Sequence, residues 1–180
     1  GEPRALNIPF VDHATIFGFQ GFIKDYLEGG VIEQWMINNA VRTLGNVFFT
    51  HKYFNAQGFQ RIVDEFDGRL PIRIYAVKEG TTLPVSNIVY RVEAAHKDFV
   101  WVTSWIETML LRAAWYGSTV ASTSRTVAKV YKEWAKVCGA PLYNPFALND
   151  FGGRGVSAHE GAEIGGAAHG IVFLGSDTME

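Results

Sequence analysis

The sequence predicts an α/β fold, in which an α+β segment is followed by one β-α-β unit, and three observations predict it. Apolar residues recur at helical spacing in several stretches before residue 138. The period switches to two between residues 72 and 93, which is typical of a pair of strands. A glycine-rich loop then joins a short strand to a helix of small residues, and another strand follows. With 180 residues, 48% of them hydrophobic and 19% charged, the chain is long and apolar enough for a packed core.

The expected elements of the first part follow from this periodicity. A helix is predicted to end at Gly29-Gly30, and another to begin at Asn55 as its N-cap and to end at Asp67-Gly68. A break or kink is expected in the longest helix near residues 117–119, because glycine and two hydroxyl residues interrupt it. Residues 14–27 are expected to begin with alternating apolar residues and to continue as a helix, and further helices are expected over 32–44 and 55–67. Strands are expected over 72–76 and 88–93, joined through a turn at 78–80. A long helix is expected over 101–137.

A change in composition at residues 139–141 predicts a domain boundary, with domains over residues 1–140 and 141–180. The second domain is expected to hold a strand at 146–148, a helix at 156–169 and a strand at 171–174. Its helix is rich in glycine and alanine, which allows close packing on neighbouring backbone. The two strands would be parallel, and such a unit needs further strands to complete its sheet.

The charge and the cysteine content exclude some classes of function. A net charge of −2 supports neither nucleic acid nor an anionic membrane as a partner. No apolar run approaches the ~20 residues of a membrane helix, and no signal peptide is present. Cys138 is the lone cysteine, which predicts a reducing, cytoplasmic location, and it is expected to be a small buried residue at a helix end. The chain lacks an initiator methionine and stops where a new helix would begin, so both ends are expected to be cut.

The loop at residues 149–157 and the segment at 175–177 carry the candidate site. Phe151 precedes two glycines, so its ring is expected to be open for stacking on a flat ligand ring, although core packing is the commoner role of phenylalanine. Arg154 lies in a loop that opens a helix, where backbone N–H groups and the guanidinium fork both suit a phosphate. The alternative, at even odds, is a surface arginine paired with Asp150 or with a carbonyl.

Asp177 has two interpretations. It has the capping-box spacing with Glu180, so it could simply cap the next helix. It could also accept a hydrogen bond from a ligand amide, and its charge would then repel a ligand carboxylate and select amide over acid. His159 and His169 are interpreted as structural. No pattern for a Walker loop, a catalytic triad or a zinc site is found, so no metal site is predicted.

The chain resembles the nicotinamide phosphoribosyltransferase family, over most of its length and in the N-terminal portion of these enzymes. Order and spacing of the shared segments make the resemblance specific. They are F-D-G-R-L-P-I at residues 66–72, A-V-K-E-G at 76–80, W-I-E-T-M-L at 105–110, T-V-A-S-T-S-R at 119–125, D-F-G-G-R-G-V-S at 150–157 and G-S-D-T at 175–178.

The resemblance implies an α/β domain packed on an irregular barrel of parallel strands, of which residues 141–180 would be the first part. It implies a homodimer that joins nicotinamide to phosphoribosyl pyrophosphate, with Mg²⁺ bound to the pyrophosphate. Phe151 would stack on nicotinamide, Arg154 would contact phosphate or pyrophosphate, and Asp177 would hydrogen-bond the carboxamide. Ala147 and Asn149 depart from basic and histidine residues that are frequent in the family.

Much of the barrel would lie outside this chain, so the chain alone is expected to be inactive. Two alternatives remain open from the sequence. One is a relative that uses nicotinate or another pyridine. The other is a short protein that binds a partner and does no chemistry.

Overall fold

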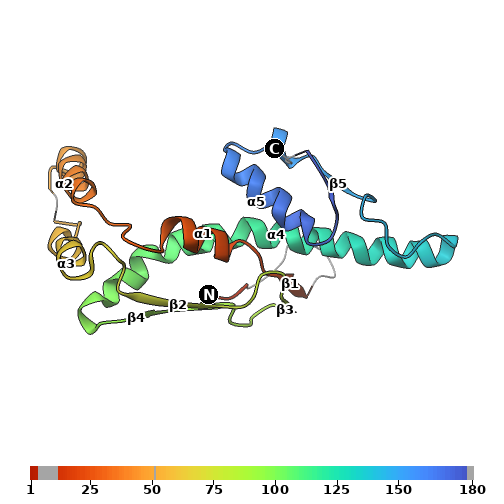
Figure 1. The fold of residues 1–180 in the computed structure, drawn as a ribbon, viewed down its shortest axis with the longest axis horizontal. Helices are drawn as coiled ribbons and strands as arrows, with labels where there is room; N and C mark the ends of the chain where they lie inside the picture. Colours follow the sequence, from red (N-terminus) through yellow and green to blue (C-terminus); the bar gives the residue numbers. More distant parts are fainter. Residues whose placement is uncertain (4–11, 51, 178–180) are drawn as a thin grey trace. The chain divides into compact units, whose positions relative to one another are not determined.

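The structure is a computed structural model that describes residues 1–3, 12–50 and 52–177 (Figure 1). Its contacts divide the chain into two compact units, each described here by itself. Unit 1 comprises Gly1–Gln20, Ala76–Arg91 and Met109–Glu180, and unit 2 comprises Gly21–Tyr75 and Val92–Thr108. The expected domain division at residue 140 concerns the domains of a longer protein, which these units do not test, and it stays a prediction.

Helices and short strands are mixed along the chain, so the expected α/β class is confirmed at that level. The elements in chain order are β1 (His13–Thr15), α1 (Phe19–Tyr26), α2 (Gln34–Phe48), α3 (Ala56–Phe66), β2 (Ile72–Ala76), β3 (Thr82–Pro84), β4 (Tyr90–Ala94), the 3-10 turn η1 (Lys97–Phe99), α4 (Val100–Cys138), β5 (Asn149–Asp150), the 3-10 turn η2 (Gly152–Arg154), α5 (His159–Gly170) and β6 (Gly175–Ser176).

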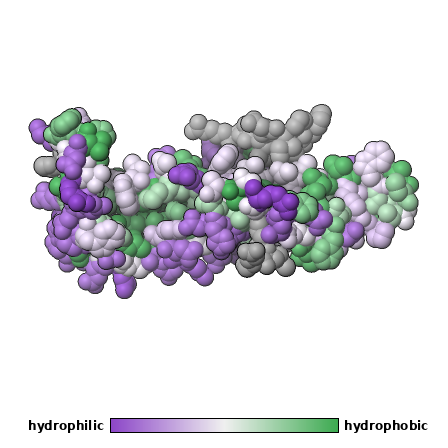
Figure 2. Space-filling model, turned by 90° about the horizontal axis from the view of Figure 1, so that it is seen from above, coloured by the Kyte–Doolittle hydropathy of each residue, from purple (hydrophilic) through white to green (hydrophobic). Residues whose placement is uncertain are grey.

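Exposed apolar side chains gather on the C-terminal part of α4 and the loop that follows it. The large ones are Val130, Trp134, Val137, Leu142, Tyr143 and Phe146. Figure 2 shows apolar surface over this part of the chain, toward the right of the view. Cys138, the last residue of α4, is also exposed, so its expected burial is wrong. None of the helices in the described ranges combines the length and apolar character of a membrane span.

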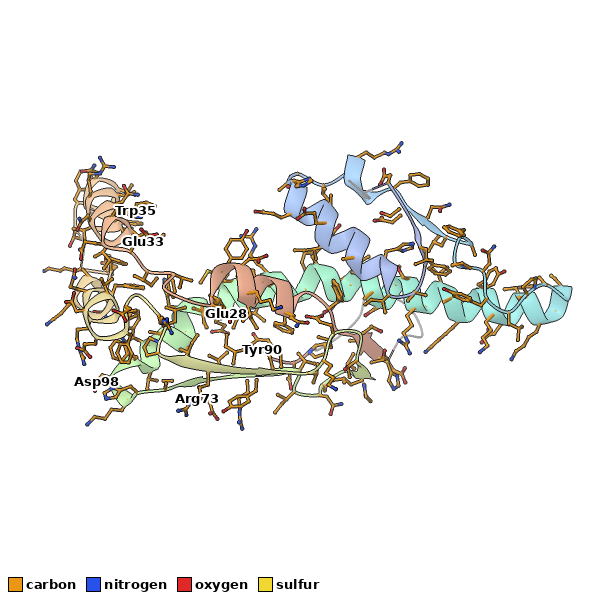
Figure 3. All side chains as sticks on the ribbon, in the orientation of Figure 1. Glu28, Glu33, Trp35, Arg73, Tyr90 and Asp98 are labelled. Atoms are coloured by element: carbon orange, nitrogen blue, oxygen red, sulfur yellow. The ribbon has the colours of Figure 1, made fainter. Side chains whose placement is uncertain are left out.

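Unit 2 is built around the buried faces of its helices. α2 starts at Gln34, where the Trp35 indole N–H donates to the Glu33 carboxylate at 3.0 Å (Figure 3). α3 begins as predicted, because the Asn55 side chain accepts from the Gly58 N–H at 3.0 Å. It ends at Asp67, whose φ of 52° is left-handed, so the helix cannot continue. The buried apolar residues of this unit are Ile37, Phe59, Ile62, Leu70, Phe99, Val102 and Ile106.

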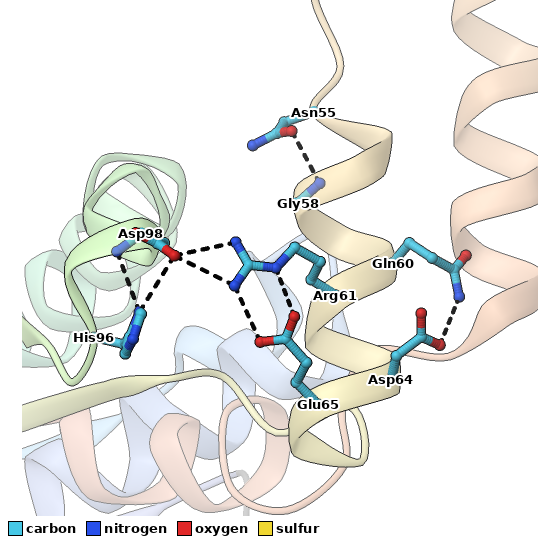
Figure 4. Close-up of polar contacts among 8 residues, drawn as sticks. All are labelled: Asn55, Gly58, Gln60, Arg61, Asp64, Glu65, His96 and Asp98. Carbon is cyan, nitrogen blue, oxygen red and sulfur yellow. Dashed lines mark hydrogen bonds and ion pairs between the residues drawn. The ribbon is translucent and has the colours of Figure 1, made fainter.

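A polar cluster joins α3 to η1 in unit 2 (Figure 4). The Arg61 Nε donates to Glu65 Oε1 at 2.6 Å, and both Nη atoms donate to Asp98 Oδ2 at 3.3 Å. The guanidinium carbon lies 5.0 Å from the centre of the fully buried Phe99 ring. The hydrogen bond from Arg61 lowers the pKa of the Glu65 carboxyl. The Arg61 guanidinium therefore covers the buried Phe99 ring on its solvent side.

The predicted strand pair forms, and one strand was missed. β2 pairs with β4, and the hydrogen bonds from Ala95 N–H to Pro71 O and from Val77 N–H to Val89 O show that the pair is antiparallel. The missed strand is β3, which pairs antiparallel with β1. β3 has three residues, too few for an alternating pattern to be seen in the sequence. β1 is equally short and overlaps the alternating start expected at residue 14.

The long helix α4 is continuous, so the expected break near residues 117–119 is wrong. The hydroxyl of Thr119 donates to the carbonyl oxygen of Trp115 at 2.7 Å, one turn earlier in the same helix. Gly117 has a packing role instead: a Cβ there would lie 2.8 Å from Phe17 O and 3.2 Å from the Ile164 side chain. The glycine therefore allows a close approach to Phe17 and Ile164, and a kink at this position stays a prediction.

Candidate functional site

The candidate site in unit 1 is built on a small parallel β-α-β unit. β5 pairs with β6 in parallel, with Asn149 opposite Gly175 and Asp150 opposite Ser176, and α5 is the crossover. Both strands lie slightly later than the expected ranges 146–148 and 171–174. Residues 144–147 form a turn instead, because the Asn144 side chain and carbonyl accept from the N–H groups of the residues at 146 and 147.

The second strand is displaced for a similar reason. The N–H groups of Val172 and Phe173 both donate to His169 O, at 3.0 Å, so the end of α5 continues as a turn through these residues. Extended backbone resumes only near Gly175. That residue is required to be small, because a Cβ at Gly175 would overlap the Asn149 side chain on the adjacent strand.

The expected helix start at residue 156 is also wrong. α5 begins at His159, after Ala158, which gives no side-chain cap. Arg154 lies instead in η2, a single 3-10 turn that packs against α5. The helix N-terminus therefore does not hold Arg154, and any attraction of Arg154 for an anion comes from its own guanidinium.

The structure brings the three predicted residues together. The Asp177 carboxylate accepts from Arg154 Nε at 3.1 Å and from Gly153 N–H at 3.4 Å. The Arg154 guanidinium carbon lies 5.1 Å from the centre of the Phe151 ring. Asp177 is itself held in place, because its N–H donates to Asp150 O at 2.9 Å. Residues 26 positions apart in sequence thus form one cluster of a ring, a cation and a carboxylate, named here the Arg154 cluster.

The alternatives raised for these residues are resolved in part. Phe151 is 58% exposed, so it does not pack into the core formed by this chain. Arg154 pairs with Asp177 rather than with Asp150, whose Oδ1 instead accepts from Gly152 N–H at 2.9 Å. The capping-box interpretation of Asp177 needs Glu180, which lies outside the described residues.

The exposures of the Arg154 cluster leave binding groups available. The side chain of Arg154 is 72% exposed and that of Asp177 is 21% exposed. Only Nε of the guanidinium is used within the described part of the chain, so both Nη groups can donate to a ligand. The carboxylate retains unused lone pairs. A flat ring with an amide and a nearby phosphate would find a complementary group for each part.

His169 connects α5 to α4 and to the residue that precedes β5, next to the candidate site. Its ring is buried, with Nδ1 at 2.9 Å from Ser124 Oγ of α4 and Nε2 at 3.3 Å from Leu148 O, just before β5. It also stacks on Phe173 at 5.5 Å between ring centres. The structural interpretation of His169 is confirmed. Its partner Ser124 was missed, because the two residues are 45 positions apart and no local pattern links them.

His159 is likewise not part of the cluster. It lies at the start of α5, where its Nε2 is 3.2 Å from Glu163 Oε1, one helical turn later, on an exposed face. Among the residues that the structure describes, no group of three or more metal-ligating side chains comes together.

Known proteins match the chain at the level of sequence. Residues 2–74 match a family model described as nicotinamide phosphoribosyltransferase, N-terminal domain. A relative from Xanthomonas campestris pv. campestris, named nicotinamide phosphoribosyltransferase, is 38% identical over 171 residues, which are 93% of this chain. Relatives with the same name from Acinetobacter baylyi and Mycoplasma genitalium are 30% and 24% identical over 94% and 96% of the chain.

These matches fall in one class of protein, the phosphoribosyltransferases. Within that class the chain belongs to the nicotinamide phosphoribosyltransferase family, which confirms the resemblance found in the motifs. The chain spans 35% of the length of the first two relatives and 40% of the third. It therefore corresponds to a part of such a protein, with the N-terminal domain model covering residues 2–74.

Proposed function

We propose that this chain is the part of a nicotinamide phosphoribosyltransferase that holds the pyridine ring of the substrate. The whole protein would convert nicotinamide and phosphoribosyl pyrophosphate to nicotinamide mononucleotide and pyrophosphate, for NAD biosynthesis. The Arg154 cluster carries the proposal, because it presents a ring face, a guanidinium and a carboxylate at the end of two parallel strands. The names of the relatives support the same substrate.

Each residue of the cluster would act on a different part of the ligand. The exposed Phe151 ring would stack on nicotinamide. Asp177 would accept from the carboxamide N–H₂ while Gly153 and Arg154 keep its carboxylate oriented. The free Nη groups of Arg154 would contact a phosphate or pyrophosphate group with charge-assisted hydrogen bonds.

In the proposed reaction the pyridine nitrogen attacks the anomeric carbon of the ribose as pyrophosphate departs. The residues of this chain would contribute by binding and orienting the ring, which makes the attack effectively intramolecular. Mg²⁺ would bind the pyrophosphate oxygens, as the family resemblance implies. We further propose a barrel that extends the β5–β6 pair, a homodimer and a cytoplasmic location.

The test is the choice between amide and acid in the full-length protein. Asp177→Asn keeps an accepting oxygen and removes the charge that would repel nicotinate. We expect the ratio of kcat/KM for nicotinamide to kcat/KM for nicotinate to fall by about tenfold or more, as one desolvated like-charge contact predicts. Glu163→Gln is the matched control, because it removes an exposed carboxylate of α5 and should leave the ratio unchanged.

An unchanged ratio in Asp177→Asn would contradict the proposed role and favour the alternative, a nicotinate-type enzyme. A protein that forms no mononucleotide from either pyridine would favour the third possibility, a chain that binds a partner without chemistry. The amide preference of the unsubstituted protein, measured in the same assay, separates these two outcomes.

A further inference from the structure

A second polar site lies in unit 1, between the β1–β3 pair and α4. It is a pocket of about 60 Å³. The residues that line it are Asp12, His13, Thr15, Thr82, Ser122, Arg125, Thr126 and Lys129. Seven of these eight side chains carry a hydroxyl group or can carry a positive charge, so the lining is rich in hydrogen-bond donors. We name it the Arg125 pocket.

The Arg125 pocket is separate from the Arg154 cluster. Ser124 of α4 bonds His169 of α5, which supports the cluster, whereas Ser122 bonds the backbone N–H of Thr15 in β1 at 2.9 Å. Side chains two positions apart on an α-helix point in directions about 160° apart. The two sites therefore use different sides of α4, and the second is independent of the proposed function.

Within the described residues, neither of two cations of the pocket forms an ion pair with a carboxylate. Arg125 and Lys129 are one helical turn apart on α4 and both are exposed. In the described part of the chain neither makes a hydrogen bond or an ion pair. Like charges at this spacing repel each other and destabilise a helix. An anion bound between them would relieve that repulsion and satisfy both groups.

The hydroxyl groups offer one further donor. Thr15 Oγ1 and Thr82 Oγ1 are 2.9 Å apart, so this contact uses one of their two O–H groups and leaves the other. Ser122 and Thr126 do not compete, because their hydroxyls donate to the carbonyl oxygens of Ser118 and Ser122 within α4. Thr15 is buried and its hydroxyl contacts that of Thr82, so the pair holds the spare donor, on whichever residue it lies, close to the pocket.

Asp12 is the one opposing charge. Its Oδ1 lies 2.6 Å from His13 Nδ1, and that hydrogen bond is the main reason that the pKa of the Asp12 carboxyl is lowered, with a smaller contribution from Lys129. Asp12 therefore stays ionised at neutral pH, but its charge is directed to His13. It weakens the attraction of the pocket for anions without cancelling two cations.

We propose that the Arg125 pocket binds a phosphate group. A tetrahedral oxyanion has enough acceptor oxygens to take the Arg125 fork, the Lys129 ammonium and the spare threonine hydroxyl at once. The phosphate is either free inorganic phosphate or the phosphate end of a nucleotide, and the two share this chemistry. A bound phosphate would connect the β1–β3 pair to α4. The packing between these elements would then depend on the phosphate concentration.

The experiment is a titration of the chain with inorganic phosphate, followed by amide chemical shifts in NMR spectra at constant ionic strength. Shifts are expected at Thr15, Ser122 and Arg125. Arg125→Ala with Lys129→Ala should weaken binding by about tenfold, as loss of two exposed charge contacts predicts. Lys24→Ala with Arg42→Ala is the matched control, because it removes the same two residue types from exposed positions of unit 2.

Asp12→Asn gives a test of opposite sign. Removing the opposing carboxylate should tighten phosphate binding, which loss of folding cannot imitate. A second titration with adenosine monophosphate identifies the source of the group: tighter binding than phosphate indicates a nucleotide, and equal or weaker binding indicates the free anion. Shifts confined to Gly153 and Arg154, or equal affinities in the double variant and its control, would overturn the proposal. Neither result would bear on the choice between nicotinamide and nicotinate.

Discussion

Two clusters in this chain each combine a guanidinium, a phenylalanine ring and a carboxylate, but only one of them is open to a ligand. In unit 2 the Arg61 guanidinium lies 5.0 Å from the Phe99 ring centre and bonds two carboxylates, Glu65 and Asp98. In unit 1 the Arg154 guanidinium lies 5.1 Å from the Phe151 ring centre and bonds one carboxylate, that of Asp177. The difference lies in the surroundings: the Phe99 ring is fully buried, while the Phe151 ring is 58% exposed.

The comparison shows that an arginine over a phenylalanine ring does not by itself mark a binding site. Around Arg61 the three nitrogens of the guanidinium all donate within the chain, and Phe66 packs edge-on against Phe99 at 5.2 Å. Four of the five N–H donors of Arg61 are therefore used within the chain, and the ring beneath the guanidinium is buried. Around Arg154 a ring face and two Nη groups stay available. Burial of the ring and satisfaction of the donors therefore separate a structural cluster from a candidate site.

The largest expected effect is that of removing the buried ring. Phe99→Ala should lower the free energy of unfolding by about 3–5 kcal/mol, because it leaves a cavity beneath Arg61. Phe151→Ala should change it by less than about 0.5 kcal/mol, because its ring is already in water. Urea denaturation monitored by circular dichroism measures both. Equal losses of unfolding free energy in the two variants would show that Phe151 is a core residue, and would contradict the difference between the two clusters.

A smaller effect is expected from removing the arginines. Arg61→Ala leaves Glu65 and Asp98 facing each other without a cation, so we expect a measurable loss of stability, smaller than that of Phe99→Ala. Arg154→Ala should leave stability nearly unchanged, since that side chain is mostly exposed. The urea midpoints of the two variants provide the comparison. If Arg154→Ala were the more destabilising, the Arg154 cluster would be structural.

The smallest effect is a dependence on pH. The hydrogen bond from Arg61 lowers the pKa of folded Glu65 below its usual value of 4.5. A carboxyl with a lowered pKa stabilises the fold above its unfolded value, and this contribution is lost as the pH falls through the folded value. The unsubstituted chain should therefore have a higher urea midpoint than Glu65→Gln at pH 7. The gap should narrow below pH 4.5, and a gap that widens in acid would contradict the assignment.

Much of the fold could be predicted because its signals are local. The Asn55 cap, the end of α3 at Asp67 and the antiparallel strands β2 and β4 follow from patterns a few residues long. The boundaries of β5 and β6 were displaced, because Asn144 and His169 accept turn hydrogen bonds from the N–H groups of residues that periodicity assigns to strands. The start of α5 was also displaced.

By itself the sequence determined the α/β class, the family and the three residues of the Arg154 cluster, because motifs and periodicity are carried by neighbours along the chain. Only the tertiary structure decided that Arg154 pairs with Asp177, that His169 bonds Ser124, and that Gly117 is a point of close packing. It also decided which arginine–phenylalanine pair is buried. Such contacts join residues distant in sequence, and they are set by how elements pack, which no local pattern records.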